Sequence, residues 1–174
     1  MKFKSLVAVL VVSGLLLTSL IGAEEAKDAK KDDIKEILKT VKCPLSGKAV
    51  DETKTVVYKD SKVYFCCENC PKAFAEAAKT KPEVAAKANQ QLVMTKQATQ
   101  VLCVMNGKGK INKETKLKVA GLEVNTCCKN CLGKLTEMAE KDQMELVFGK
   151  NFDKAFEVKA QKEKENKEKE KKAA

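Results

Sequence analysis

Two short stretches of the chain place cysteines where their thiols can share a metal ion. "VYFCCENCPKAF" ends an apolar run with two adjacent cysteines and a third one three residues later, and "NTCCKNCLGKL" repeats this arrangement. Upstream of each stretch stands one more cysteine, Cys43 or Cys103, with a glycine four residues after it. Thiolates from a tight knuckle and from a second loop can converge on one ion, with Zn–S distances of about 2.3 Å. The candidate ligands are Cys43, Cys66, Cys67, Cys70, Cys103, Cys127, Cys128 and Cys131.

The cysteines mark an internal duplication of the chain. Cys103 follows Cys43 by 60 residues, and each cysteine of the later cluster follows its counterpart by 61. "VKCPLSGKAV" aligns with "VLCVMNGKGK", which matches Lys48 with Lys108, and "CCENC" aligns with "CCKNC". Because every cysteine belongs to this repeat, the sequence predicts two copies of one unit.

A β-hairpin is predicted to deliver each cysteine cluster. In the first copy the strands are "TVVYK" and "KVYFC" around a turn at "DS", and in the second they are "KLKV" and "LEVNTC" around "AG". Alternating apolar residues and β-branched side chains favour strands in these segments. Each unit has about 60 residues and few aromatic side chains, so its own core is expected to be marginal and to need a metal or covalent staple.

Helices are predicted after each cluster, because the apolar spacing changes there. One face of the first helix carries Phe74, Ala77 and Ala78. The corresponding face in the second copy carries Leu132, Leu135, Met138 and Ala139. Pro82 is expected to open a further helix toward Met94, with "MELVFGKNFDKAF" as its counterpart. The predicted unit is therefore ββα with an added helix.

The adjacent cysteines leave the number of ligands open. On a regular strand, Cys66 and Cys67 point to opposite faces, so both reach one ion only if the chain leaves strand geometry there. Each site then has either four ligands, or three ligands and one free thiol. The methionines Met94, Met105, Met138 and Met144 are scattered, and packing is the simpler account of them than thioether ligation.

At these residues the chain resembles the YHS and TRASH families of small metal-associated domains. The shared features are "CPLSGKAV" and the aromatic-Phe-Cys-x-x-x-Cys-x-x-x-Phe spacing of "VYFCCENCPKAF"; the second copy lacks the aromatics and the proline. The resemblance implies a treble-clef-like or zinc-ribbon-like ββα unit that binds or senses metals such as zinc or copper. By position it implies the ligands Cys43, Cys66 and Cys70, then Cys103, Cys127 and Cys131. The chain has no histidine, which leaves sulfur ligation alone.

Two other uses of the cysteines stay open. In an oxidising compartment eight cysteines can form four disulfides, which makes the chain a stapled structural or interaction domain without metal. "CENC" and "CKNC" can also act as redox-active C-x-x-C pairs that exchange disulfides with clients. The short C-x-x-C spacing favours metal knuckles over structural disulfides, which usually close longer loops.

The ends of the chain indicate export. Lysines at positions 2 and 4 precede an almost wholly apolar run over residues 6–21, and small residues follow at 22 and 23, as in a secretory signal. The last residues, "KAQKEKENKEKEKKAA", predict a solvated helix or a disordered tail. The net charge of +10 is spread along the chain and accompanied by only two Tyr, six Phe and no Trp. A lysine-rich surface therefore accounts for the charge better than nucleic-acid binding does.

Together these patterns predict an exported α+β protein, periplasmic or secreted, made of two tandem small ββα cysteine-knuckle units. Its predicted activity is the binding of metal ions, Zn²⁺ or alternatively Cu⁺, without catalysis. No nucleic-acid partner and no stable membrane insertion after signal cleavage are expected, and the sequence identifies no protein partner. The predicted segments are a signal peptide (1–23), a charged linker or helix (24–39), the first unit (40–97), the second unit (98–157) and a Lys/Glu-rich tail (158–174).

Overall fold

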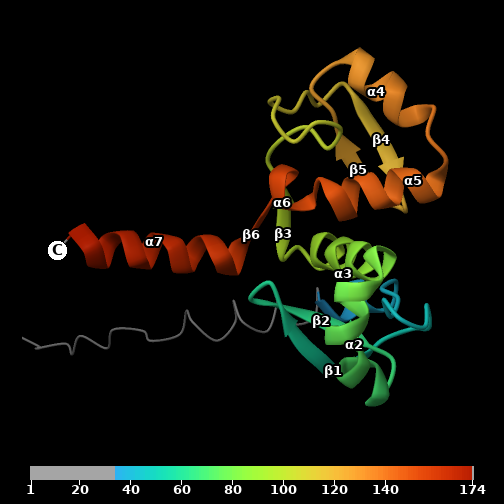
Figure 1. Cartoon of the computed structure of the whole chain (residues 1–174), viewed down its shortest axis with the longest axis vertical. Coiled ribbons are helices and arrows are strands. Elements are labelled where there is room, and N and C mark those ends of the chain that lie inside the picture. Colours follow the sequence, from blue (N-terminus) through green and yellow to red (C-terminus); the bar gives the residue numbers. More distant parts are fainter. Residues whose placement is uncertain (1–33, 174) are drawn as a thin grey trace, which may run out of the picture.

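The computed structural model describes residues 34–173, so the predicted signal peptide and most of the linker lie outside the described range. Within it the chain is α+β, with two-stranded antiparallel sheets and short helices. Two ββα arrangements follow one another in sequence and stack in space, with α3 and α5 lying between them (Figure 1). In this part of the chain, no helix has the length and apolar character needed to cross a membrane.

The first arrangement begins with a helical turn at residues 34–38 and continues with β1 (Asp51–Tyr58), β2 (Ser61–Phe65) and α2 (Asn69–Thr80). The hairpin turn is formed by Lys59 and Asp60, one residue before the predicted "DS" turn. Both turn residues have positive φ, 49° and 59°. This is the turn geometry whose twist matches the flanking strands, so the pairing of Tyr58 with Ser61 sets the turn position.

The second arrangement consists of β4 (Lys116–Val119), β5 (Leu122–Asn125) and α4 (Lys129–Thr136). Its hairpin turns at Ala120 and Gly121, as predicted. The helix ends at Thr136, so the prediction that Met138 and Ala139 continue its apolar face is wrong. The amide of Gln143 donates to the carbonyls of Leu135 and Met138, at 2.9 and 3.0 Å, and so satisfies groups that a longer helix would have used.

The added helix of the first copy is α3 (Pro82–Met94), which begins at the predicted proline. Its counterpart is not one helix over "MELVFGKNFDKAF". The chain there forms α5 (Glu140–Met144), the π-helix η1 (Glu145–Lys150), α6 (Phe152–Ala155) and the strand β6 (Phe156–Val158). The helix is interrupted where the amide of Asn151 donates to the carbonyls of Val104 and Met105, both at 2.9 Å. This contact ties the end of η1 to the Cys103 turn.

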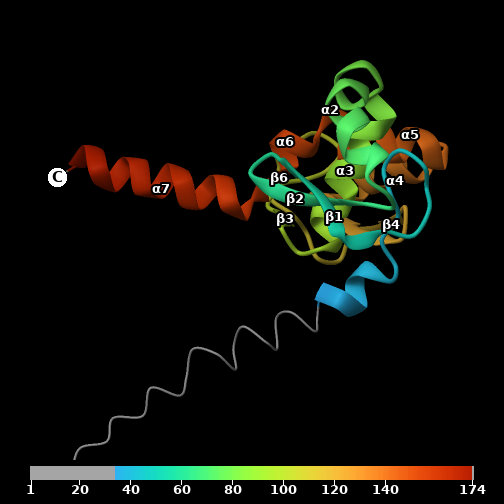
Figure 2. The same ribbon diagram turned by 90° about the horizontal axis from the view of Figure 1, so that it is seen from below.

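The first and last strands of the second copy pair with each other. β3 (Ala98–Gln100) opens it and pairs antiparallel with β6, which is its last strand. The tail then forms α7 (Lys159–Ala173), which extends away from the rest of the molecule in both views (Figures 1 and 2). A solvated helix, one of the two predicted states of the tail, is therefore the one that forms.

The two copies share one hydrophobic core. Buried side chains of both copies, from Val63 and Phe74 to Leu135 and Phe148, belong to a single cluster. The sequence left open whether the two units pack together, and in the structure they do.

The copies meet at α3 and η1. The Asn89 amide donates to the Phe148 carbonyl at 2.7 Å, and the Gln90 amide donates to the Ala120 carbonyl at 2.7 Å. Gly149 lies beside α3, since a Cβ placed on it would be in ordinary contact with the Cβ of Ala86, at 3.7 Å. The sites described next are therefore carried by one packed body.

Candidate metal centres

The upstream cysteine of each copy lies in a tight turn. The backbone N–H of Gly47 donates to the Cys43 carbonyl at 2.8 Å, and the N–H of Gly107 donates to the Cys103 carbonyl at the same distance. Both glycines have positive φ, 71° and 65°, which explains why glycine stands four residues after the cysteine in each copy. The turns bury the two cysteines almost completely, at 1% and 0% exposure.

The second turn is one residue longer than the first. The N–H of Cys43 bonds to the carbonyl of Lys48, whereas the N–H of Cys103 bonds to the carbonyl of Gly109, both at 2.8 Å. Gly109 is therefore the structural counterpart of Lys48, and the sequence alignment of Lys48 with Lys108 is wrong. This inserted residue accounts for the change in repeat spacing from 60 to 61 residues.

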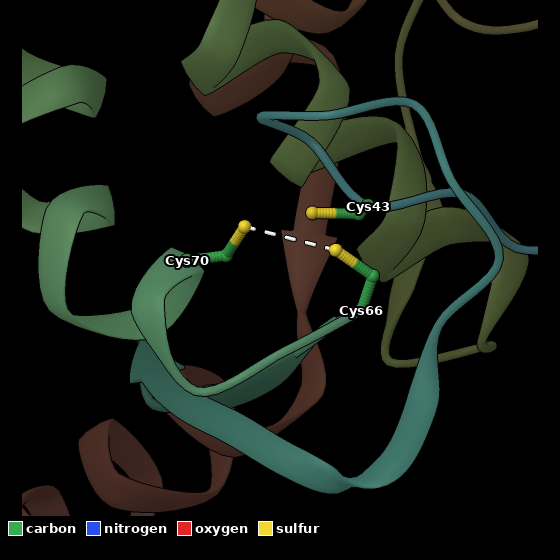
Figure 3. A group of neighbouring side chains, drawn as sticks. All are labelled: Cys43, Cys66 and Cys70. Carbon is green, nitrogen blue, oxygen red and sulfur yellow. Dashed lines mark hydrogen bonds between the residues drawn. The ribbon is translucent and has the colours of Figure 1, made fainter.

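The junction of hairpin and helix supplies the other sulfurs. Cys66 directly follows β2, and Cys70 is in the first turn of α2. In the second copy Cys127 lies in the loop between β5 and α4, and Cys131 is in the first turn of α4. Figure 3 shows the result in the first copy, where Cys43, Cys66 and Cys70 come from a turn, a strand end and a helix and point their sulfurs toward one another.

Each copy thus forms a cysteine triad. In the first triad (Cys43, Cys66, Cys70) and in the second triad (Cys103, Cys127, Cys131), all sulfur atoms lie within 4.8 Å of one another. Within them, the Cys66 and Cys70 sulfurs are 3.7 Å apart, and those of Cys127 and Cys131 are 3.6 Å apart. Sulfurs bound tetrahedrally to one ion at about 2.3 Å lie about 3.8 Å apart. The triads therefore have the dimensions of a metal–thiolate site.

The two remaining predicted ligands, Cys67 and Cys128, are exposed and lie outside these mutually close groups; we call them the outer thiols. The Cys67 sulfur is 3.5 Å from that of Cys70, and the Cys128 sulfur is 3.7 Å from that of Cys127. Of the two arrangements that the sequence left open, the structure thus has three converging sulfurs and one additional thiol per copy. None of the eight cysteines, all in the described range, forms a disulfide.

The first triad combines one acidic and one weakly acidic thiol. Burial opposes the ionisation of Cys43, but hydrogen bonds from Ser46 and from the backbone of Cys66 outweigh it and lower the Cys43 pKa from 9.0 to about 7. Burial, followed by hydrogen bonds with the Cys67 and Cys66 side chains, raises the pKa of Cys70. Cys43 therefore ionises much more readily than Cys70, and a cation that binds the Cys70 sulfur must displace its proton.

The second triad shows the same division. Burial opposes ionisation of Cys103, but backbone N–H groups, with that of Met105 first, outweigh it and lower its pKa. Burial and hydrogen bonds with the Cys127 and Cys128 side chains raise the pKa of Cys131 to about 12. The repetition of this pattern shows that it follows from the turn–hairpin–helix geometry that both copies share.

Two polar residues beside the triads were missed by sequence reasoning. The Ser46 hydroxyl lies 3.1 Å from the Cys66 sulfur, whereas in the second copy the Asn106 amide donates to the sulfurs of Cys127 and Cys131 at 3.9 and 4.0 Å. Each stands three residues after the upstream cysteine, which is the signal that could have identified both. The two triads are therefore alike in their ligands and unlike in the groups that support them.

Comparison with known proteins gives no further assignment. The chain matches no protein-family model, and no curated protein or solved structure compared with it matches. The resemblance to the YHS and TRASH families remains a prediction that depends on the quoted motifs.

Proposed function

We propose that this protein binds two metal ions through cysteine thiolates, one ion in each triad, and that zinc is the ion it holds. The observation that carries the proposal is the pair of triads, each with three sulfurs within 4.8 Å of one another. Two copies that differ in most residues have kept the same sulfur arrangement, which packing alone does not require. The proposal assigns no reaction to the chain, so the ions are structural or are cargo.

The donor set suits a soft or borderline cation. Thiolates select zinc, Cu⁺ and related ions over hard cations such as Mg²⁺ or Ca²⁺. Three sulfurs leave a fourth position for water or for an outer thiol if the ion is tetrahedral. The net positive charge of the chain and its lysine-rich surface also offset the negative charge that several thiolates bring to one ion.

Copper is the second candidate because of one cavity. A hollow of about 410 Å³ between the copies is lined by Cys43, Met94 and Met144. Thiolate and thioether sulfur together are ligands that favour Cu⁺. The same hollow is also lined by Lys42 and Lys87, so a cation in it would meet positive charge unless the thiolates neutralise it.

Export to the periplasm or beyond belongs to the same proposal. It is supported by the basic start and the apolar run in the first 23 residues, which lie outside the described range. Membership of the YHS or TRASH families is likewise proposed from the motifs around Cys43 and Cys66.

Native mass spectrometry of the full chain tests the function. We expect the protein, purified without added metal or reductant, to carry two metal ions. After acid denaturation under conditions that prevent oxidation, all eight cysteines should be found as free thiols. Cys43→Ser and Cys103→Ser are each expected to lose one ion, and each variant serves as the other's control. A mass lowered by eight hydrogens without metal means four disulfides, and a loss of two hydrogens per copy means redox-active pairs. Either result contradicts metal binding.

A further inference from the structure

The four cysteines of each copy differ in how far they are exposed to solvent. Cys43 and Cys103 are buried, the other two members of each triad are half-buried, and the outer thiols Cys67 and Cys128 are exposed. A thiol that served only as a fourth ligand would be expected to converge with the triad, and neither outer thiol does so. An exposed thiol that binds nothing is easily oxidised, which is a disadvantage to the protein. An exposed outer thiol in both copies therefore suggests that it has a function.

Each outer thiol is close to one member of its triad. The sulfurs of Cys67 and Cys70 are 3.5 Å apart, and those of Cys128 and Cys127 are 3.7 Å apart. These separations are those of two sulfurs on one ion, about 3.8 Å for tetrahedral zinc. An ion held by Cys67 and Cys70 would thus already be bound to one triad sulfur, and it would enter the triad by binding the other two and releasing Cys67.

The surface of the second copy shows how an ion would arrive. An open hollow of about 740 Å³ has both Cys127 and Cys128 in its lining, together with the carboxylate-bearing side chains of Glu114 and Glu137. The buried Cys103 is not part of this lining. In the second copy the outer thiol and one triad cysteine therefore share an open hollow, whose wall carries two acidic residues and the exposed Lys129. In the first copy a different hollow is lined by Cys43 and not by Cys67. This shared access is therefore particular to the second copy, whereas the short sulfur separations occur in both copies.

We propose that Cys67 and Cys128 are transfer ligands, which take a thiophilic cation from a thiol-bearing donor, or give it to a thiol-bearing acceptor, while the triads are its resting sites. The inference depends on the proposed metal binding and adds an activity to it: exchange of the ion with small thiols or with cysteines of another protein.

The transfer balances without any change of oxidation state. The outer thiol gives its proton to water or to the leaving donor thiolate, and its sulfur binds the ion as the donor–metal bond breaks. The neighbouring triad cysteine then binds, and the remaining two follow, each with release of any proton it still holds. The bond from the ion to the outer sulfur breaks last, and that sulfur regains a proton. Release to an acceptor is the same sequence in reverse.

The test separates rate from affinity in the full-length protein. Zinc-loaded wild type and the Cys67→Ser/Cys128→Ser variant are mixed with an excess of 2,3-dimercaptosuccinate, and the loss of bound Zn²⁺ is followed over time by native mass spectrometry. Affinity is measured separately by competition with a chromogenic chelator. The control variant is Glu68→Gln/Asn130→Gln, which changes exposed neighbours of the outer thiols, removes no sulfur and leaves the lining of the hollow unchanged.

We expect the double serine variant to bind two ions with an affinity within about threefold of wild type and to transfer them at least about tenfold more slowly. The control variant should transfer them at the wild-type rate. Unchanged transfer in the serine variant overturns the inference and leaves the proposed function standing. A large loss of affinity in that variant also overturns it, because the outer thiols are then fourth ligands. A wild-type protein that binds no metal refutes the proposed function itself.

Discussion

A single added methyl group at Gly109 should weaken zinc binding at the second triad and leave the first triad unaffected. A Cβ built on Gly109 would lie 2.7 Å from the Cβ of Cys127 and 3.0 Å from its sulfur. Ordinary contacts begin at 3.4 Å, so in Gly109→Ala the two residues must separate by about 0.7 Å (3.4 minus 2.7). Gly109 itself is held, because its carbonyl accepts from Cys103 at 2.8 Å and its N–H donates to Asn106 at 3.2 Å. The displacement therefore falls on the Cys127 ligand.

Overpacking of this kind costs about 1–3 kcal/mol. If the whole of that cost falls on the metal-bound state, the second-site affinity drops by roughly fivefold to 150-fold, since about 1.4 kcal/mol corresponds to a factor of ten. The assay is a competitive Zn²⁺ titration in a Cys43→Ser background, which removes the first site and leaves one affinity to measure. Gly133→Ala is the matched control, because a methyl group there has open space in α4 and should stabilise the helix by about 0.5–1 kcal/mol.

Equal second-site affinities of Gly109→Ala and its parent would refute this reasoning, because Cys127 would then not be the ligand that faces Gly109. A Gly109→Ala variant that weakens zinc binding in a Cys103→Ser background, where only the first site remains, would refute it as well. That result would mean that the methyl acts through the shared core and not through the adjacent sulfur.

Three further outcomes are expected. In the metal-free, reduced protein, Cys43 has a folded pKa of about 7 against 9.0 when unfolded. The unfolded chain then binds more protons between these values, so urea stability should rise between about pH 7 and pH 9, and less so in Cys43→Ser. Phe74→Ala should cost about 3–5 kcal/mol in urea denaturation, because this buried ring packs against two others, whereas Val57→Thr at an exposed position should change stability by less than about 0.5 kcal/mol. Asn106→Asp, which keeps the acceptor but puts a charge beside the thiolates, should weaken zinc binding at the second site more than Asn106→Ser does, by the same titration; equal effects would contradict the role given to the amide.

The local units could be predicted from the sequence because their signals are local. Strand alternation, the change to helical spacing and the turn at Ala120 and Gly121 are all encoded within a few residues of where they act. The same holds for the triads, since a cysteine at a strand end and another in the next helical turn are brought together by the chain itself. The number of converging sulfurs at Cys66 and Cys67 is different, because it depends on backbone angles in a segment that is neither strand nor helix.

What could not be predicted is mostly contact between distant residues. Three glutamines use both atoms of their amides to pair with the edge of a sheet, as a neighbouring strand would: Gln91 with Tyr64, Gln97 with Lys62 and Gln100 with Asn125, at 2.6–2.9 Å. Glutamine is usually a surface residue, so its position in the sequence carries no sign of this role. The shared core is hidden for the same reason, since Asn89 and Phe148 are 59 residues apart.

The sequence shows that the second copy has one extra residue, but only the structure shows that this residue lies in the Cys103 turn. A change of spacing from 60 to 61 reveals that one residue was gained between the upstream cysteine and the cluster, but any position in that interval would give the same count. The backbone hydrogen bonds of Cys43 and Cys103 place the gain in the Cys103 turn. There it brings a glycine against Cys127, while Asn106 in the same turn reaches two of the sulfurs. These differences between the two triads should give the two proposed sites unequal affinities, so we expect zinc to bind in two resolved steps when it is titrated into the full chain.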